Sequence, residues 1–124
     1  MADYTPVFAN GTAPFTQQAS ATVTGGRLVE NTGNGTVGPA GAASVKVVGV
    51  AATDAANGAK VQVWPLPGLV HEVTGTGALN AGDNLAAGAA GVVAAIGAGT
   101  FAQLVGTVLI GAADAQTVRF LGRN

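Results

Sequence analysis

Side chains that could perform acid–base or nucleophilic chemistry are scarce in this sequence. It has one histidine and no cysteine, and only 9% of its 124 residues are charged. The histidine, His71, is followed by Glu72. Adjacent residues on a strand point to opposite faces, so these two do not form a catalytic pair, and we expect His71 at the surface of a strand or turn. Since no residue pair offers a base and a nucleophile, we expect no catalytic residues and no enzyme activity.

Motifs for cofactors and metals are equally weak. The segment 33–38 fits GxGxxG, a dinucleotide-binding pattern when it joins a strand to a helix, but Pro39 follows directly and no helix of useful length can start there. Asp54, Asp83 and Asp114 lie beside turn-like segments and lack the dense ligand spacing of a calcium loop. The absence of cysteine excludes thiolate metal sites. We therefore expect no bound cofactor and no metal ion.

Charge and hydropathy argue against two classes of partner. The net charge is −1 and the five basic residues are scattered, which gives no electrostatic footprint for nucleic acid. Residues 84–113 carry no charge, but six glycines interrupt them and large apolar residues are few, so a membrane span is not expected. The first fifteen residues lack the basic and apolar regions of a signal peptide.

The sequence must therefore be read for the elements that present a contact surface. Residues 45–52 and 59–64 are β-branched runs that flank a segment with Asp and Asn-Gly, which predicts a β-hairpin. Residues 104–110 and 117–122 repeat the same pattern near the C-terminus. Further short strands are expected at 21–23, 27–29 and 92–95, with Gly- and Asn-rich loops between them.

These patterns divide the chain into two related halves. Val48-Gly49 matches Val105-Gly106, and residues 61–63 match 118–120, both at an offset of 57 residues. Upstream, residues 24–29 resemble 80–85 at an offset of 56. We expect an all-β fold, a small β-sandwich or barrel built from two hairpin-rich halves at 19–68 and 75–122 within one domain of residues 19–124. An alternative for 85–90 is a short helical turn.

Residues 1–18 have no counterpart in this repeat. They hold three of the six aromatic residues and two of the five prolines, which predicts an extended N-terminal arm that docks elsewhere. The alternative is a disordered tail whose aromatic side chains fold back on the protein's own core. The side chains expected to make contacts are Tyr4, Pro6, Val7, Phe8 and Phe15.

A second candidate surface is the segment Trp64, Pro65, Leu66 and Pro67. Proline removes donors from a sheet and usually ends a strand or keeps it at an edge, so this segment could expose an aromatic contact patch. It could equally be the kinked linker between the two halves, with Trp64 covering the core.

Taken together, the order and spacing of these pieces resemble the capsid decoration (cement) proteins of bacteriophages. Residues 47–63 resemble the central hairpin of that family, residues 81–85 its recurrent Gly-Asp turn, and residues 104–109 with 118–121 its closing hairpin. The likeness spans residues 15–122 and departs from the family pattern at Pro65 and Pro67 and in the longer N-terminal segment.

This resemblance implies a structural virion protein, made in the host cytoplasm and bound to the outer surface of the capsid. It implies a homotrimer that bridges major capsid protein subunits and stabilises the expanded head. The high content of glycine, 20 residues, also favours help from self-association or a partner surface, because glycine loses much conformational freedom on folding. The alternative function is a virion-surface module that recognises a glycan or host receptor through the Trp64 region.

Overall fold

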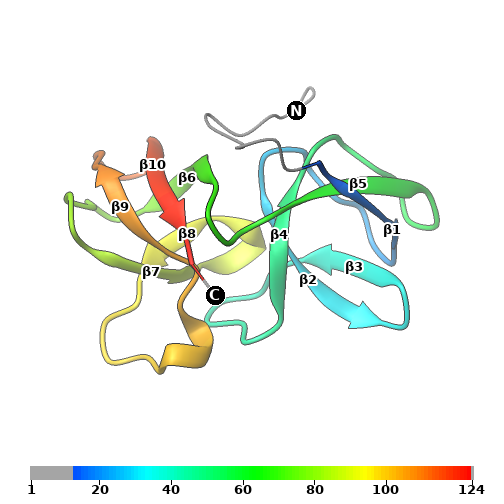
Figure 1. Cartoon of the computed structure of the whole chain (residues 1–124), viewed down its shortest axis with the longest axis horizontal. Helices are drawn as coiled ribbons and strands as arrows, with labels where there is room; N and C mark the ends of the chain where they lie inside the picture. Colours follow the sequence, from blue (N-terminus) through cyan, green and yellow to red (C-terminus); the bar gives the residue numbers. More distant parts are fainter. Residues whose placement is uncertain (1–12, 124) are drawn as a thin grey trace.

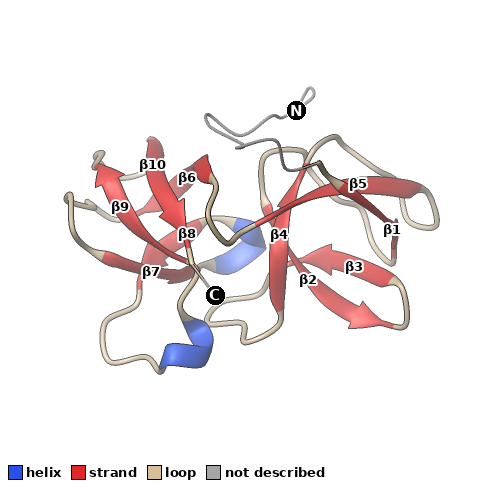
Figure 2. Ribbon diagram, viewed as in Figure 1, coloured by secondary structure: helices blue, strands red, loops and turns tan. Residues whose placement is uncertain are grey.

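The computed structural model describes residues 13–123 and has an all-β fold. Its strands form two closed barrels that lie side by side, and the described chain adds only two short 3-10 helices (Figures 1 and 2). The predicted all-β class and its two related halves are confirmed. Residues 1–12 of the predicted arm lie outside the described residues.

The first barrel contains five strands in the order β1-β3-β2-β4-β5. Their bounds are β1 Phe15–Ala19, β2 Leu28–Gly33, β3 Thr36–Pro39, β4 Val47–Ala51 and β5 Lys60–Pro65. Residues 31–36, whose Gly and Asn content favours a loop, instead contain the end of β2, a two-residue turn and the start of β3, and Gly35 in that turn takes a φ of 71°. Asn-Gly turns favour hairpins because both residues tolerate positive φ.

The second barrel follows the same order, β10-β6-β8-β7-β9. Its strands are β6 Val70–Thr76, β7 Asn84–Ala87, β8 Val93–Ala95, β9 Gly106–Ile110 and β10 Thr117–Gly122. Two 3-10 helices, η1 Ala89–Gly91 and η2 Phe101–Gln103, lie in its loops. The helical turn considered for 85–90 is therefore a strand followed by a single 3-10 turn.

Strand pairing shows how closely the halves match. β1 pairs parallel with β3 and antiparallel with β5, and β6 pairs in the same ways with β8 and β10. Gly49 faces Pro65 across β4 and β5, as Gly106 faces Gly122 across β9 and β10, at an offset of 57 residues. The predicted alignment therefore corresponds to equivalent places in the two ladders.

The matched glycines Gly49 and Gly106 have a shared steric cause. A Cβ at Gly49 would overlap the Trp64 carbonyl, and a Cβ at Gly106 would lie 2.6 Å from the Leu121 carbonyl. Trp64 and Leu121 are themselves equivalent in the repeat. Glycine is required at both positions because the neighbouring strand approaches too closely for any side chain.

Strand boundaries extend the repeat beyond the predicted limits. Residues 15–18, assigned to the arm from the sequence, belong to β1, which pairs with β5 from Phe15 to Gln18. β1 is thus the counterpart of β6. The short strand expected at 21–23 does not form, because Val23 makes only an isolated bridge with Ala55, whereas the strand expected at 27–29 is the start of β2.

A β-bulge in β4 allows this strand to contribute side chains to the cores of both barrels. Along β4, Val48 and Ala51 pack inside the first barrel, whereas Val47 and Val50 pack against the second. Simple alternation would not place them so, but the β2–β4 register shifts at Val29 and Glu30, which inserts an extra residue into β4. The resulting change of face turns Val47 and Val50 outward toward the other barrel.

The two barrels share a continuous apolar core. Leu28, Val50 and Ala40 of the first half join a cluster dominated by the second barrel, including Phe120 and Leu85. Backbone hydrogen bonds cross the same joint, since the Gly91 amide donates to Ala40 (2.9 Å) and the Ala43 amide donates to Ala87 (2.8 Å). The two halves therefore pack against each other through a shared core and do not form separate domains.

Candidate interaction surface

The predicted arm contacts fall into two groups. Tyr4, Pro6, Val7 and Phe8 lie outside the described residues. Phe15 is half-buried in β1 and packs on the core of the first barrel. The structure therefore makes Phe15 a barrel residue, because its strand completes the ladder between β3 and β5.

The segment Trp64, Pro65, Leu66 and Pro67 does not form one surface patch. Leu66 is 2% exposed and joins the core shared by the barrels. Trp64 and Pro65 are half-buried in β5, and only Pro67 is exposed. This segment is the connection between the halves, and Leu66 anchors it because it fills the space at the joint.

His71 is buried, which corrects its predicted surface position. It has no exposed area, its ring lies 5.8 Å from that of Phe120, and its Nε2 is 2.9 Å from the Pro65 carbonyl oxygen. Burial lowers the pKa of His71 to about 4, and the contact with Pro65 opposes that shift only in part. Glu72 points to the opposite face, where it binds Arg119 at 2.9 Å.

Asp54, Asp83 and Asp114 stabilise turns. Asp54 accepts a hydrogen bond from the Gly25 amide (2.8 Å), Asp114 from Gly77 (2.7 Å) and Asp83 from Asn80 (2.9 Å). The Gly25 amide lowers the pKa of Asp54, because a hydrogen bond favours the carboxylate. Within residues 13–123, no three metal-ligating side chains gather into a possible metal site.

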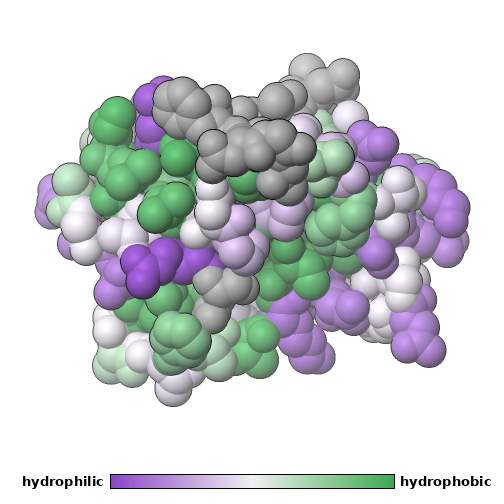
Figure 3. Space-filling view, in the orientation of Figure 1, coloured by the Kyte–Doolittle hydropathy of each residue, from purple (hydrophilic) through white to green (hydrophobic). Residues whose placement is uncertain are grey.

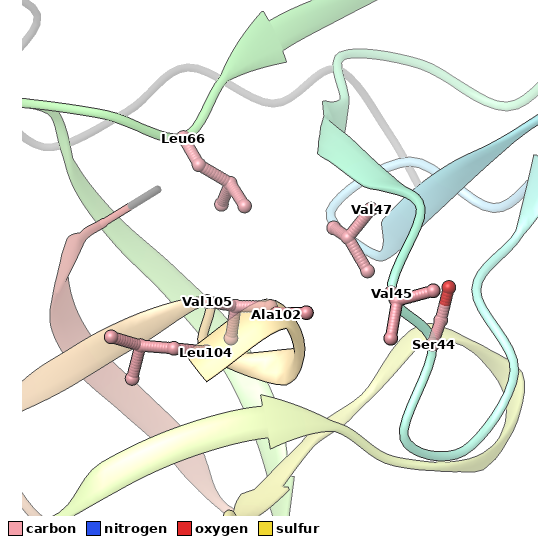
Figure 4. Close-up of a pocket in the computed structure, with 7 residues that line it drawn as sticks. All are labelled: Ser44, Val45, Val47, Leu66, Ala102, Leu104 and Val105. Atoms are coloured by element: carbon pink, nitrogen blue, oxygen red, sulfur yellow. The ribbon is translucent and has the colours of Figure 1, made fainter. Parts of the chain in front are cut away.

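One concavity of the described chain is an interbarrel groove with a volume of about 240 Å³. Its lining residues come from the β3–β4 loop and β4, from the linker, and from η2 and the start of β9; they are Ser44, Val45, Val47, Leu66, Ala102, Leu104 and Val105. In Figure 4, Leu66, Val47 and Val105 approach this space from three directions. Six of the seven lining side chains are apolar, and the seventh is that of Ser44.

The rim of the interbarrel groove exposes large apolar side chains. Val45 is 58% exposed and Phe101, which begins η2 next to Ala102, is 73% exposed. Burying such side chains in a partner would remove apolar surface from water, which drives most protein association. Figure 3 shows hydrophobic surface over the second barrel both around η2 and near the end of β9.

The second of these regions is formed by Leu109 and Ile110, which are 46% and 57% exposed. The β9–β10 register shifts between Arg119 and Phe120, which leaves Leu109 as the extra residue in β9. At the equivalent place in the first barrel stand Ala52 and Thr53. The apolar pair is therefore a feature of the second barrel alone.

Sequence reasoning missed the interbarrel groove and its rim. Its two main groups of lining residues, at 44–47 and 102–105, are separated by more than 50 positions along the chain and meet only because the barrels pack together. A signal was nevertheless present at Phe101, a large apolar residue within a Gly-rich, charge-free segment where turns, and hence exposure, are expected.

Fold and surface together define a small two-barrel β protein with a groove at the joint of its barrels. No family model matches the chain, and no curated protein matches it. Among solved structures, the chain is similar to the N base of head fiber gp8.5 in bacteriophage phi29. The two are 22% identical, the match covers 90% of this chain and 93% of that one, and the TM-score is 0.67. At this identity the likeness shows a shared fold.

Membrane insertion was not expected from the sequence. Along residues 13–123, none of the helices has the length and apolar character that a bilayer crossing demands.

Proposed function

We propose that this protein is a structural component of a bacteriophage virion and attaches to the phage head. The observation that carries this proposal is the similarity, over nearly the whole length of both chains, to the base of a phage head fiber. The sequence resemblance to capsid decoration proteins points to the same location by an independent route. On this proposal the protein acts by contact and not by catalysis, and its one histidine serves the barrel core.

The finer proposal is that the protein binds the outer surface of the capsid and stabilises the expanded head by bridging major capsid protein subunits. We propose that it does so as a homotrimer, which would present three copies of the N-terminal segment at once. Linked binding sites raise the effective concentration of each contact and turn weak contacts into firm attachment. The exposed Leu109 and Ile110 pair supports self-association, because it places adjacent large apolar side chains at the surface.

The alternative, recognition of a glycan or host receptor, depended on a surface around Trp64. Leu66 lies in the core and Trp64 is half-buried, so no observation favours that function. We therefore carry only the head-attachment proposal forward.

The test is reconstitution on heads isolated from a phage mutant that lacks this protein. We expect the purified protein to bind with a fixed copy number per head and to raise the temperature at which heads release DNA. Deleting residues 2–12, which leaves β1 intact, should weaken binding if the N-terminal segment contributes contacts. Absence of wild-type binding would contradict head attachment, and full binding by the deletion variant would contradict the role of the arm alone.

A further inference from the structure

Two asparagine–glycine pairs lie in turns of the described chain. Asn34 and Gly35 form the two-residue turn between β2 and β3, and Asn57 and Gly58 lie in the turn before β5. All four residues are exposed. An asparagine followed by glycine is prone to lose its side-chain amide, because glycine has no side chain to hinder attack by its own backbone nitrogen. Both turns are therefore candidate sites of a spontaneous covalent modification.

The nucleophile in this deamidation is the backbone nitrogen of the glycine. It gives its proton to a base of the solvent and attacks Cγ of the preceding asparagine, which closes a five-membered succinimide ring. The bond between Cγ and Nδ2 breaks, and the side-chain nitrogen takes up a proton and leaves as ammonia. Water then opens the ring at either of its carbonyl carbons, which leaves an aspartyl or an isoaspartyl residue. The net reaction consumes one water and releases one ammonia.

Steric access to the two glycines is alike. A Cβ at Gly35 or at Gly58 would meet no atom within 4 Å, and their φ angles are both positive, 71° and 90°. Each glycine carbonyl also accepts a hydrogen bond from Gln18, whose backbone amide donates to Gly35 (3.0 Å) and whose side chain donates to Gly58 (3.2 Å). A difference in reactivity between the turns must therefore have another cause.

The backbone amides of the two glycines differ in their hydrogen bonds. The Gly58 amide donates to the Ala19 carbonyl at 2.7 Å, a short distance for a backbone hydrogen bond. Within residues 13–123 the Gly35 amide donates no hydrogen bond, and the β2–β3 ladder ends at the pair of Gly33 and Thr36. A bonded amide must separate from its acceptor before it can lose its proton and attack. The fold therefore protects the turn at Gly58 and leaves the turn at Gly35 reactive.

We propose that Asn34 is a site of spontaneous deamidation in the folded protein, whereas Asn57 is protected. Three other asparagines of the described chain are followed by residues with a side chain, which hinders the same attack; they are Asn31, Asn80 and Asn84. Head attachment is not required for this reaction, which needs only the folded chain and water.

The products change one end of the first barrel. Figure 1 shows the β2–β3 turn on the side of the first barrel that faces away from the second. The aspartyl product adds a carboxylate there to a chain whose net charge is −1. The isoaspartyl product also lengthens the backbone of the turn by one carbon atom, which disturbs the neighbouring pair of Gly33 and Thr36.

The test incubates the purified protein at mildly alkaline pH and follows each site by peptide mapping with mass spectrometry. Cleavage after lysine and arginine places Asn34 in peptide 28–46 and Asn57 in peptide 47–60. A third pair, Asn10 with Gly11, lies outside the described residues and falls in peptide 1–27. We expect Asn34 to react at least about fivefold faster than Asn57, the factor that corresponds to ~1 kcal/mol for one backbone hydrogen bond.

The matched control is the same incubation in denaturant, where the two rates should converge because the bond from Gly58 to Ala19 is lost. Asn34→Gln, whose longer side chain disfavours ring closure, should remove the modification from peptide 28–46 and leave the rate at Asn57 unchanged. Equal rates in the folded protein, or a faster rate at Asn57, would overturn the proposed site. So would an Asn34 that reacts in denaturant but not in the folded protein. None of these outcomes bears on binding to phage heads, which is measured separately.

Discussion

The two barrels share one ladder but fill it with side chains of different size. The interior of the first barrel consists of alanine and valine, with Phe15 at its edge. The second contains Phe120, Leu79 and Leu85 and also recruits Leu28 and Leu66 from the first half and the linker. Equivalent backbone pairing therefore does not require equivalent cores. The second barrel and the joint therefore contain most of the bulky buried side chains.

The largest expected change in the free energy of unfolding comes from comparing Phe120→Ala with Val63→Ala. These residues are equivalent in the repeat and neither has exposed area. Removing a buried phenylalanine costs about 3–5 kcal/mol, and removing the two methyl groups of valine costs about 2 kcal/mol. Denaturant unfolding at equal protein concentration measures both changes. Equal losses at the two positions would show that the barrels contribute alike.

This comparison also shows what the sequence could and could not predict. The hairpins β4–β5 and β9–β10 were predictable, because β-branched runs and turn residues are local signals. The repeat was visible because close backbone approach requires glycine at both 49 and 106. These features depend on residues near one another in the chain or on the same steric constraint used twice.

The groove and the position of His71 were not predictable for the opposite reason. A β-bulge at Val48 decides which side chains of β4 face each core. Valine is not a residue type that predicts a bulge, so the sequence does not indicate it. His71 lies on the inner face of β6 because the barrel closes around it, and a lone histidine between Val70 and Glu72 carries no such information. Both outcomes are decided by tertiary packing rather than by local preference.

The second prediction concerns the pH dependence of stability that results from the burial of His71 in the second barrel. Its folded pKa is about 4, below the unfolded value of 6.5, so the unfolded chain binds the proton more readily. The stability associated with neutral His71 is complete above pH 6.5 and is lost as the pH falls from 6.5 toward 4. Between pH 7.5 and pH 5 we expect a loss of roughly 2 kcal/mol in the free energy of unfolding.

The control for that titration is His71→Leu, which should flatten the pH dependence over the same interval. The equivalent position in the first barrel is Phe15, which pairs with Val63 as His71 pairs with Phe120 and has no titratable group. Denaturant melts at pH 7.5, 6.5, 5.5 and 5 separate this effect from carboxylate titration at lower pH. An unchanged slope in the variant would assign the pH dependence to other groups.

The smallest expected effect concerns a turn in which the two halves use different residues. Gly58 in the β4–β5 turn has a φ of 90°, and its counterpart Ala115 in the β9–β10 turn has a φ of 65°. A side chain in this left-handed region costs roughly 1–2 kcal/mol, partly offset by the lower entropy of the unfolded chain. We therefore expect Gly58→Ala to destabilise the protein by about 1 kcal/mol and Ala115→Gly to stabilise it by about 0.5 kcal/mol. A Cβ at Gly58 would meet no atom within 4 Å, so backbone strain alone is measured there. Denaturant melts measure the change in the free energy of unfolding for each substitution. Changes of opposite sign would show that positive φ disfavours a side chain equally at both turns. Changes of the same sign would show that the surroundings of the two turns differ.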